Sequence, residues 1–204
     1  MIDIERGPDL WVLTLRRPEK ANSVTKAMLA SLADAVDAAR AAGVAALVLT
    51  GEGKVFSAGA DLDDARAGLA TDPVWERLSS AIAAFPGLTI AALNGALAGG
   101  SMGMALACDI RIAVPGTKAF YPAMKLGFLP QPSDPARLVA LVGPARAKMI
   151  LMAGQKIEAD EALTWGLIDR IVPPDNLIET ARTLAADVIA AKPGHAAAIK
   201  AMIR

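Results

Sequence analysis

Residues 94–103, with the sequence NGALAGGSMG, are the stretch from which the fold is most directly inferred. They follow the apolar run Leu88–Leu93, which has the length and composition of a buried strand. The small residues of Gly99–Cys108 predict a helix that packs closely on a sheet. The start of such a helix leaves backbone N–H groups free, and small side chains let a ligand approach them.

A second glycine-rich segment, Ser57-Ala58-Gly59-Ala60-Asp61, follows another apolar run, Val44–Thr50, after a turn at Gly51–Gly53. Two such segments can each offer one N–H group to the same carbonyl oxygen and thereby form an oxyanion hole. Close packing of a helix on a sheet also requires glycine and alanine. For either segment alone, packing is the more common explanation.

The order of the remaining elements predicts an α/β fold. Strands are predicted at 11–15, 44–50, 88–93 and 110–114, and helices between them at 25–40, 74–84 and 99–108. A Pro- and Gly-rich connection at 115–135 leads to helices at 135–141, 145–151, 159–165 and 177–191, with a short strand at 167–172. We therefore expect a core over residues 1–130 and a helical C-terminal region over 131–204.

Composition and charge exclude several classes of partner. The 204 residues include 21 basic and 21 acidic side chains, so the balance gives no reason to expect nucleic acid or a membrane surface as partner. One cysteine (Cys108) and one histidine (His195) argue against a disulfide and against a zinc site. The acidic N-terminus does not resemble a signal peptide, and the uncharged stretch 78–108 is broken by Pro and Gly. We expect a cytoplasmic protein without a bound metal.

Six segments, in this order along the chain, resemble those of the crotonase, or enoyl-CoA hydratase/isomerase, superfamily. They are RPEKAN (17–22), FSAGADL (56–62), NGALAGGSMG (94–103), CDIRIA (108–113), KLGFLP (125–130) and ALTWGLID (162–169). The resemblance implies the spiral of ββα units that this superfamily shares with Clp peptidases, followed here by a short C-terminal helical region.

The resemblance also implies an acyl-CoA thioester as ligand, with coenzyme A present as part of the substrate and no other cofactor. By family position, the backbone N–H groups of Ala60 and Gly100 would bind the thioester oxygen. Such donors stabilise enolate charge on that oxygen more than they stabilise the neutral ground state. The residues expected along the coenzyme A path are Lys20, Ala21, Asn22, Ala58, Gly59, Asp61, Leu62 and Asp63.

The chain departs from the family at both positions where hydratases carry a catalytic glutamate. These positions hold Gly103 and Ala123, which cannot transfer a proton. General acid–base catalysis contributes about 10²–10⁴ in rate, so hydration by two glutamates should be severely impaired. Asp134 is the candidate replacement for the missing acids, although an N-cap role for Ser133 or Asp134 ahead of Pro135 is the more common arrangement.

The resemblance further implies a homotrimer. Family members continue beyond the helix expected at 197–204 with further helices that cover the acyl pocket and build the trimer. We therefore expect the trimer or the closure of the pocket to be weakened.

Three alternatives remain open. Residues 99–103 match the G-x-S-x-G pattern of α/β-hydrolases, with Ser101 as nucleophile and Asp169 or Asp175 and His195 completing a triad. A Clp-type serine peptidase would also use Ser101, but the sequence has no histidine between Ser101 and His195. The third alternative is a family member that binds coenzyme A thioesters without converting them, because its catalytic acids have been lost.

Overall fold

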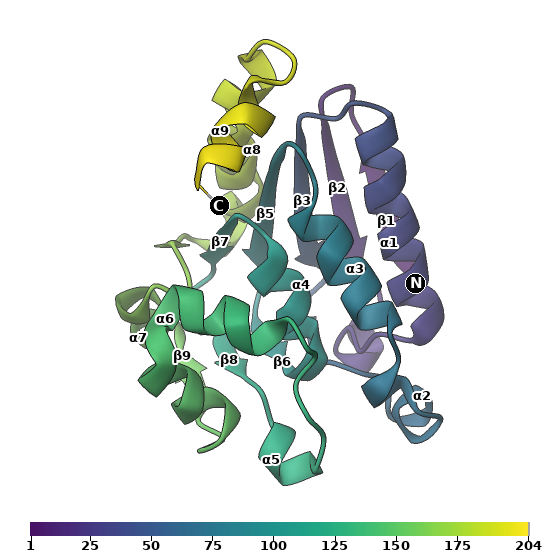
Figure 1. The fold of residues 1–204 in the computed structure, drawn as a ribbon, viewed down its shortest axis with the longest axis vertical. Coiled ribbons are helices and arrows are strands. Elements are labelled where there is room, and N and C mark those ends of the chain that lie inside the picture. The colour runs from purple at the N-terminus through teal and green to yellow at the C-terminus, as the bar shows by residue number, and fades with distance from the viewer. Residues whose placement is uncertain (204) are drawn as a thin grey trace.

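Two sheets organise the protein in a computed structural model that describes residues 1–203 (Figure 1). The larger sheet has the order β1 (Ile2–Arg6), β2 (Leu10–Leu15), β3 (Ala46–Gly51), β5 (Leu88–Leu93), β7 (Ile110–Ala113), β10 (Arg170–Ile171). The smaller sheet has the order β4 (Val55–Ser57), β6 (Ala96–Ala98), β8 (Lys118–Phe120), β9 (Ile157–Glu158). Pairing is parallel except between β1 and β2 and between β8 and β9.

Three successive turns of the chain each add one strand to both sheets. The strand pairs β3–β4, β5–β6 and β7–β8 are consecutive in sequence, and each pair is followed by at least one helix. These helices are α2 (Leu62–Arg66) and α3 (Val74–Ala83), then α4 (Met102–Ala107), and finally α5 (Ala123–Leu126) and α6 (Asp134–Leu151). This arrangement confirms the predicted spiral of ββα units.

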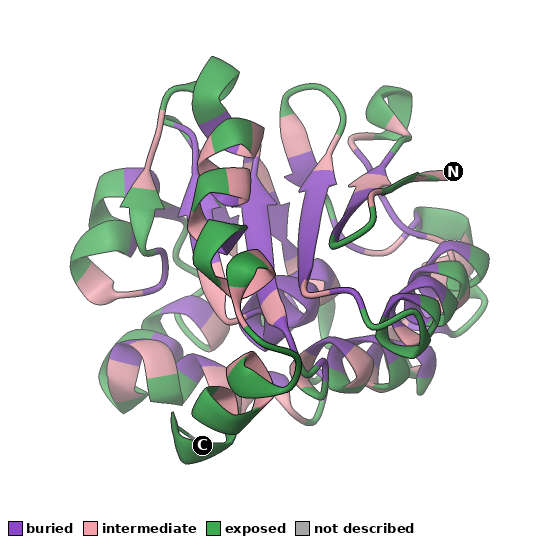
Figure 2. Ribbon diagram, turned by 90° about the horizontal axis from the view of Figure 1, so that it is seen from above, coloured by how far each residue is buried: buried purple, intermediate pink, exposed green. Residues whose placement is uncertain are grey.

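Helices cover both faces of the larger sheet because its strands are apolar on both sides. The face that carries Val12, Val48 and Ile90 packs against α8 (Leu177–Ala190). The opposite face packs against α1 (Lys26–Ala41), α3 and α4. Figure 2 shows the buried strands between helices whose outer sides are exposed. Each fully buried Val, Ile or Leu side chain contributes about 1.5–3 kcal/mol, so this double cover is the main source of stability.

The predicted segments differ from the structure mainly in the smaller sheet. Its strands have two or three residues, which is too short for a recognisable alternation, so residues 55–62 and 94–98 were predicted without strands. The predicted helix at 99–108 consists of the 3₁₀ turn η3 (Gly99–Ser101) and α4. Strand β1 was not predicted, and the strand expected at 167–172 is reduced to β10. The helices expected at 135–141 and 145–151 are joined as α6, with non-helical backbone at Gly143.

Residues beyond 130 also belong to the two sheets, because β9 pairs with β8 and β10 pairs with β7. This segment also contains α7 (Ala159–Trp165) and α9 (His195–Ile203). The division of the chain at residue 130 stays a prediction. Within residues 1–203, no helix has the length and apolar character needed to cross a membrane.

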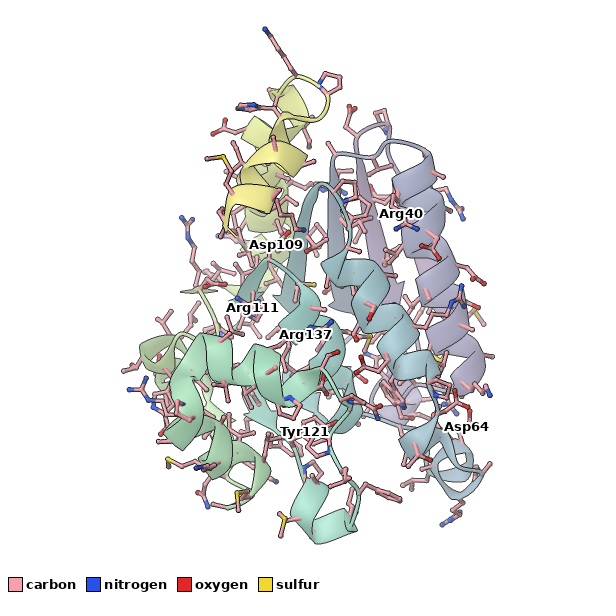
Figure 3. All side chains as sticks on the ribbon, viewed as in Figure 1. Arg40, Asp64, Asp109, Arg111, Tyr121 and Arg137 are labelled. Carbon is pink, nitrogen blue, oxygen red and sulfur yellow. The ribbon has the colours of Figure 1, made fainter. Side chains whose placement is uncertain are left out.

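Arg111 on β7 joins the core to the C-terminal region. Its side chain is 3% exposed and donates hydrogen bonds to the carbonyl oxygens of Cys108 (2.7 Å) and Leu167 (2.9 Å). It also pairs with Asp169 at 3.3 Å. One buried guanidinium therefore fixes the end of α4 and the segment that leads into β10 (Figure 3).

We predict that Arg111→Ala lowers the free energy of unfolding by about 2–5 kcal/mol, because two buried carbonyl oxygens lose their charged donor. Urea denaturation measures the change. Arg146→Ala is the matched control: Arg146 lies over the ring of Trp165, and loss of that contact should cost less than about 1 kcal/mol. Equal losses in the two variants would contradict the role of Arg111.

Candidate active site

The two glycine-rich segments meet at one end of the smaller sheet. Strands β4 and β6 are parallel neighbours, so the segments that follow them leave the sheet at the same edge. Gly59 has a φ of +96°, and a Cβ atom on it would lie 3.0 Å from the carbonyl oxygen of Ala98. Glycine is therefore required at position 59 by both backbone conformation and space.

Two backbone N–H groups at this edge are not used by the surrounding secondary structure. The bridge between Val24 and Ala60 is made by the carbonyl of Gly59 and the N–H of Asp61, which leaves out the N–H of Ala60. Gly100 is the second residue of η3, where helical geometry provides no acceptor for the backbone N–H. Ala60 and Gly100 both line the same cavity.

This cavity has a volume of about 320 Å³ and is mostly apolar. Trp75 forms part of its wall: a Cβ atom on Gly100 would lie 3.2 Å from the indole ring. The indole Nε1 donates to the carbonyl of Leu69 at 2.8 Å, which fixes the ring against Gly100. Leu126, Phe128 and Leu129 line the cavity from α5 and the segment after it.

The predicted site residues divide into two groups. The cavity is lined by six of them: Ala58, Gly59, Ala60, Leu62, Gly100 and Ala123. The cavity lining does not include Lys20, Ala21, Asn22, Asp61, Asp63, Gly103 or Asp134. Lys20 and Asp63 are exposed, and Asp63 forms an ion pair with Arg66.

Asn22 and Asp61 use their side chains to build the backbone of the site. The fully buried Asn22 donates from Nδ2 to the carbonyls of Glu52 (2.9 Å) and Val55 (2.7 Å), and its Oδ1 accepts from the N–H of Arg17. Asp61 accepts from the N–H groups of Asp63 and Asp64 at the start of α2, and from the Arg17 guanidinium at 2.8 Å. These hydrogen bonds lower the pKa of Asp61, and the bond from the backbone N–H of Asp63 has the largest effect. The Asn22 side chain therefore holds the turn that leads into β4, and the Asp61 side chain holds the chain directly after Ala60.

Ser101 is not placed as a nucleophile. Its side chain is fully buried, and its hydroxyl lies 2.6 Å from the carbonyl oxygen of Ala98. His195 is exposed at the start of α9. The geometry at Ser101 therefore gives no support to either serine-hydrolase alternative.

The space beside Gly103 is occupied by the carboxylate of Asp134. A Cβ atom on Gly103 would lie 2.7 Å from Asp134 Oδ1. Asp134 is the first residue of α6, yet its side chain makes no N-cap hydrogen bond. An acid from α6 thus lies where a side chain from α4 would begin. Ala123 is buried in the cavity wall.

Asp134 is buried, with 1% of its surface exposed, and Oδ1 has no hydrogen-bond partner among residues 1–203. Oδ2 accepts a hydrogen bond from the hydroxyl of Tyr121 at 3.2 Å. Burial raises the pKa of Asp134 to about 7, against the lowering effects of the Tyr121 hydrogen bond and the charge of Arg137. Figure 3 shows Arg137 on α6 and Tyr121 near the start of the same helix.

The site residues predicted from the sequence do not include Trp75, Tyr121 or Gln131. Trp75 falls within the helix predicted at 74–84, and Gln131 falls within the connection predicted at 115–135. Tyr121 is the single tyrosine of the chain and directly precedes Pro122, and this is the one feature of the sequence that could have pointed to it. Residues 1–203 contain no cluster of three or more His, Cys, Asp or Glu side chains that could hold a metal ion.

We predict that Gly103→Ala and Asp134→Ala are coupled in stability. Gly103→Ala alone should cost about 1–3 kcal/mol, since the new methyl group displaces a buried carboxylate. In the Asp134→Ala background the same change should be neutral or stabilise the helix by up to about 1 kcal/mol. Urea denaturation of the four proteins measures the coupling, and additive effects would contradict the contact.

We also predict a pH-dependent difference in stability between the protein and its Asp134→Asn variant. The folded protein keeps the Asp134 proton up to about pH 7, whereas the unfolded chain loses it near the ordinary value of 3.8. The free energy of unfolding of the unsubstituted protein therefore falls, relative to the variant, as pH rises from about 4 to about 7. Each pKa unit corresponds to about 1.4 kcal/mol. A relative stability that increased with pH would contradict the raised pKa.

Comparisons with known proteins find similarity over most of the chain. A family model described as enoyl-CoA hydratase/isomerase matches residues 5–204. A relative from Thermus thermophilus is 36% identical over 201 residues, which cover 92% of this chain and 77% of that protein. The crotonyl-CoA hydratase of Syntrophomonas wolfei is 34% identical over 195 residues, covering 92% of this chain and 75% of that protein.

Solved structures show the same fold. DspI from Pseudomonas aeruginosa matches with a TM-score of 0.91 at 33% identity, over 99% of this chain and 79% of that one. An enoyl-CoA hydratase/isomerase from Pseudoalteromonas atlantica matches with a TM-score of 0.91 at 28% identity, over 99% and 82%. In sequence and in fold, this chain belongs to the enoyl-CoA hydratase/isomerase family of the crotonase superfamily.

Proposed function

We propose that the protein binds enoyl-CoA thioesters and converts them through an enolate, whose oxygen is held by the backbone N–H groups of Ala60 and Gly100. The observation that carries this proposal is the meeting of the segments after β4 and β6 at one apolar cavity. Removing a proton from a carbon next to a thioester places negative charge on the carbonyl oxygen. Two fixed donors lower the energy of that charged state more than that of the neutral thioester.

The acyl group would lie in the apolar cavity, and the coenzyme A moiety would leave it past Ala58 and Leu62, which are exposed. We propose Asp134 as the acid–base group of the reaction. It is the buried carboxylate beside position 103, and its pKa of about 7 suits proton transfer near neutral pH. The side chains at positions 103 and 123 themselves offer no proton.

A second candidate function is binding of coenzyme A thioesters without conversion. The observation that favours it is the absence of an acidic side chain at both position 103 and position 123. The two candidates differ in turnover, not in affinity.

We predict that Gly100→Pro lowers kcat about 10²–10³-fold, because proline removes one of the two N–H donors. Gly100→Ala is the matched control: it keeps the N–H group, and its methyl group meets the same Trp75 ring at 3.2 Å. Turnover is followed by ultraviolet absorbance of the conjugated thioester, with crotonyl-CoA and with a 3-enoyl-CoA as substrates. Calorimetric titration measures the affinity for crotonyl-CoA.

If the Gly100→Pro variant turns over substrate as fast as the Gly100→Ala variant, the oxyanion role of Gly100 is overturned. Tight binding of crotonyl-CoA without turnover of either substrate by the unsubstituted protein would select the second candidate.

A further inference from the structure

The cavity wall offers few groups that can exchange a proton. Among the lining side chains of the described residues 1–203, the ionisable ones are Arg66 and Tyr121. The side chain of Arg66 is 76% exposed and forms an ion pair with Asp63 outside the cavity. A guanidinium also stays protonated at any physiological pH. The hydroxyl of Tyr121 is therefore the group through which a substrate in this cavity can exchange protons with the chain.

The Tyr121 hydroxyl is held by two neighbours. It donates to Asp134 Oδ2 at 3.2 Å, and it accepts from the backbone N–H of Gln131 at 3.3 Å. Asp134 itself does not line the cavity. Tyr121 thus stands between the cavity and the buried carboxylate.

We propose that Tyr121 and Asp134 form a proton relay, and that the relay moves the double bond of a 3-enoyl thioester to the 2-position. Tyr121 is the catalytic residue, because it lines the cavity, and Asp134 acts through it. This proposal rests on the proposed function: it names the substrate class and the proton path of the same site.

The number of proton-transferring groups favours isomerisation over hydration. Moving a double bond needs one acid–base couple, which takes a proton from one carbon and returns it to another. Adding water by the two-carboxylate mechanism of the family's hydratases needs one group that activates the water molecule and a second that protonates carbon. The cavity provides one relay, and positions 103 and 123 provide no second carboxylate.

The steps balance without a co-reactant. Tyr121 Oη takes a proton from C2 of the 3-enoyl thioester while its own proton passes to Asp134 Oδ2. The C2–H electron pair forms the C1–C2 double bond, and the carbonyl pair moves onto the oxygen that faces Ala60 and Gly100. In the return step the C3–C4 double bond takes a proton from Tyr121 at C4, and Tyr121 recovers its proton from Asp134. The C2–C3 double bond and the thioester carbonyl form together, with no net change in protons.

The relay needs an ionised Asp134 at the start. The groups that face it are Tyr121, Arg137 on its own helix and Glu76 on α3. Glu76 also accepts hydrogen bonds from the N–H and hydroxyl of Ser133, which fixes the start of α6. Burial is the largest influence and raises the pKa of Asp134 to about 7, so kcat/KM should rise with pH through that value and then level off.

The test uses the full chain and trans-3-hexenoyl-CoA, with formation of the conjugated thioester followed by absorbance. Tyr121→Phe and Asp134→Asn should each lower kcat about 10²–10⁴-fold with little change in KM. Asp134→Asn should also remove the rise of kcat/KM near pH 7. Asp187→Asn, an exposed change on α8, is the matched control and should leave activity unchanged. Circular dichroism establishes that each variant is folded.

Full activity in Tyr121→Phe together with a loss in Asp134→Asn would overturn the relay while leaving the proposed function in place. Full activity in both variants would overturn the relay and also the proposed role of Asp134. Hydration of crotonyl-CoA without isomerisation by the unsubstituted protein would overturn the substrate class alone. Binding without any turnover would overturn the proposed function and the relay together.

A label experiment does not depend on the folding of any variant. With substrate deuterated at C2 and ordinary water as solvent, the relay returns the same deuteron from Tyr121 to C4. Mass spectrometry of the product should therefore find deuterium at C4. Complete loss of the label to solvent would contradict a relay shielded from water.

Discussion

The parallel pairing of β4 with β6 is the constraint on which the site depends. The two strands bring the backbone of residues 58–60 against that of residues 98–100, so closely that position 59 has no room for a side chain. The contact is made by main-chain atoms, and the buried amide of Asn22 and the Arg17–Asp61 pair hold it from the far side. The N–H groups of Ala60 and Gly100, which we propose as the oxyanion donors, are thus placed by the backbone of these two segments.

The buried carboxylate that we propose as the acid–base group is placed by packing. Gly103 on α4 and Asp134 on α6 share one small volume, so a side chain on position 103 would displace the Asp134 carboxylate. In this protein the carboxylate comes from α6, and it contacts the hydroxyl of Tyr121, which lines the cavity. The same burial that excludes water from Asp134 raises its pKa toward neutrality, which is where a proton-transferring group is most effective.

Much of the larger sheet could be predicted from the sequence because its strands, such as β3 and β5, are continuous apolar runs with clear ends. The smaller sheet could not be predicted, because strands of two or three residues carry no periodic pattern. The glycine-rich segments indicated the position of the site. They gave no information about Tyr121 or Trp75, whose place in the cavity wall depends on segments far apart in sequence. The contact between Gly103 and Asp134 spans 31 positions and has no local signal.

The shared volume at positions 103 and 134 also means that the two positions cannot be altered independently. A Cβ atom at position 103 would lie 2.7 Å from Asp134 Oδ1, so a side chain there moves the carboxylate and its hydrogen bond to Tyr121. Glycine at position 103 combined with a small residue at position 134 leaves an unfilled space and no carboxylate at either position.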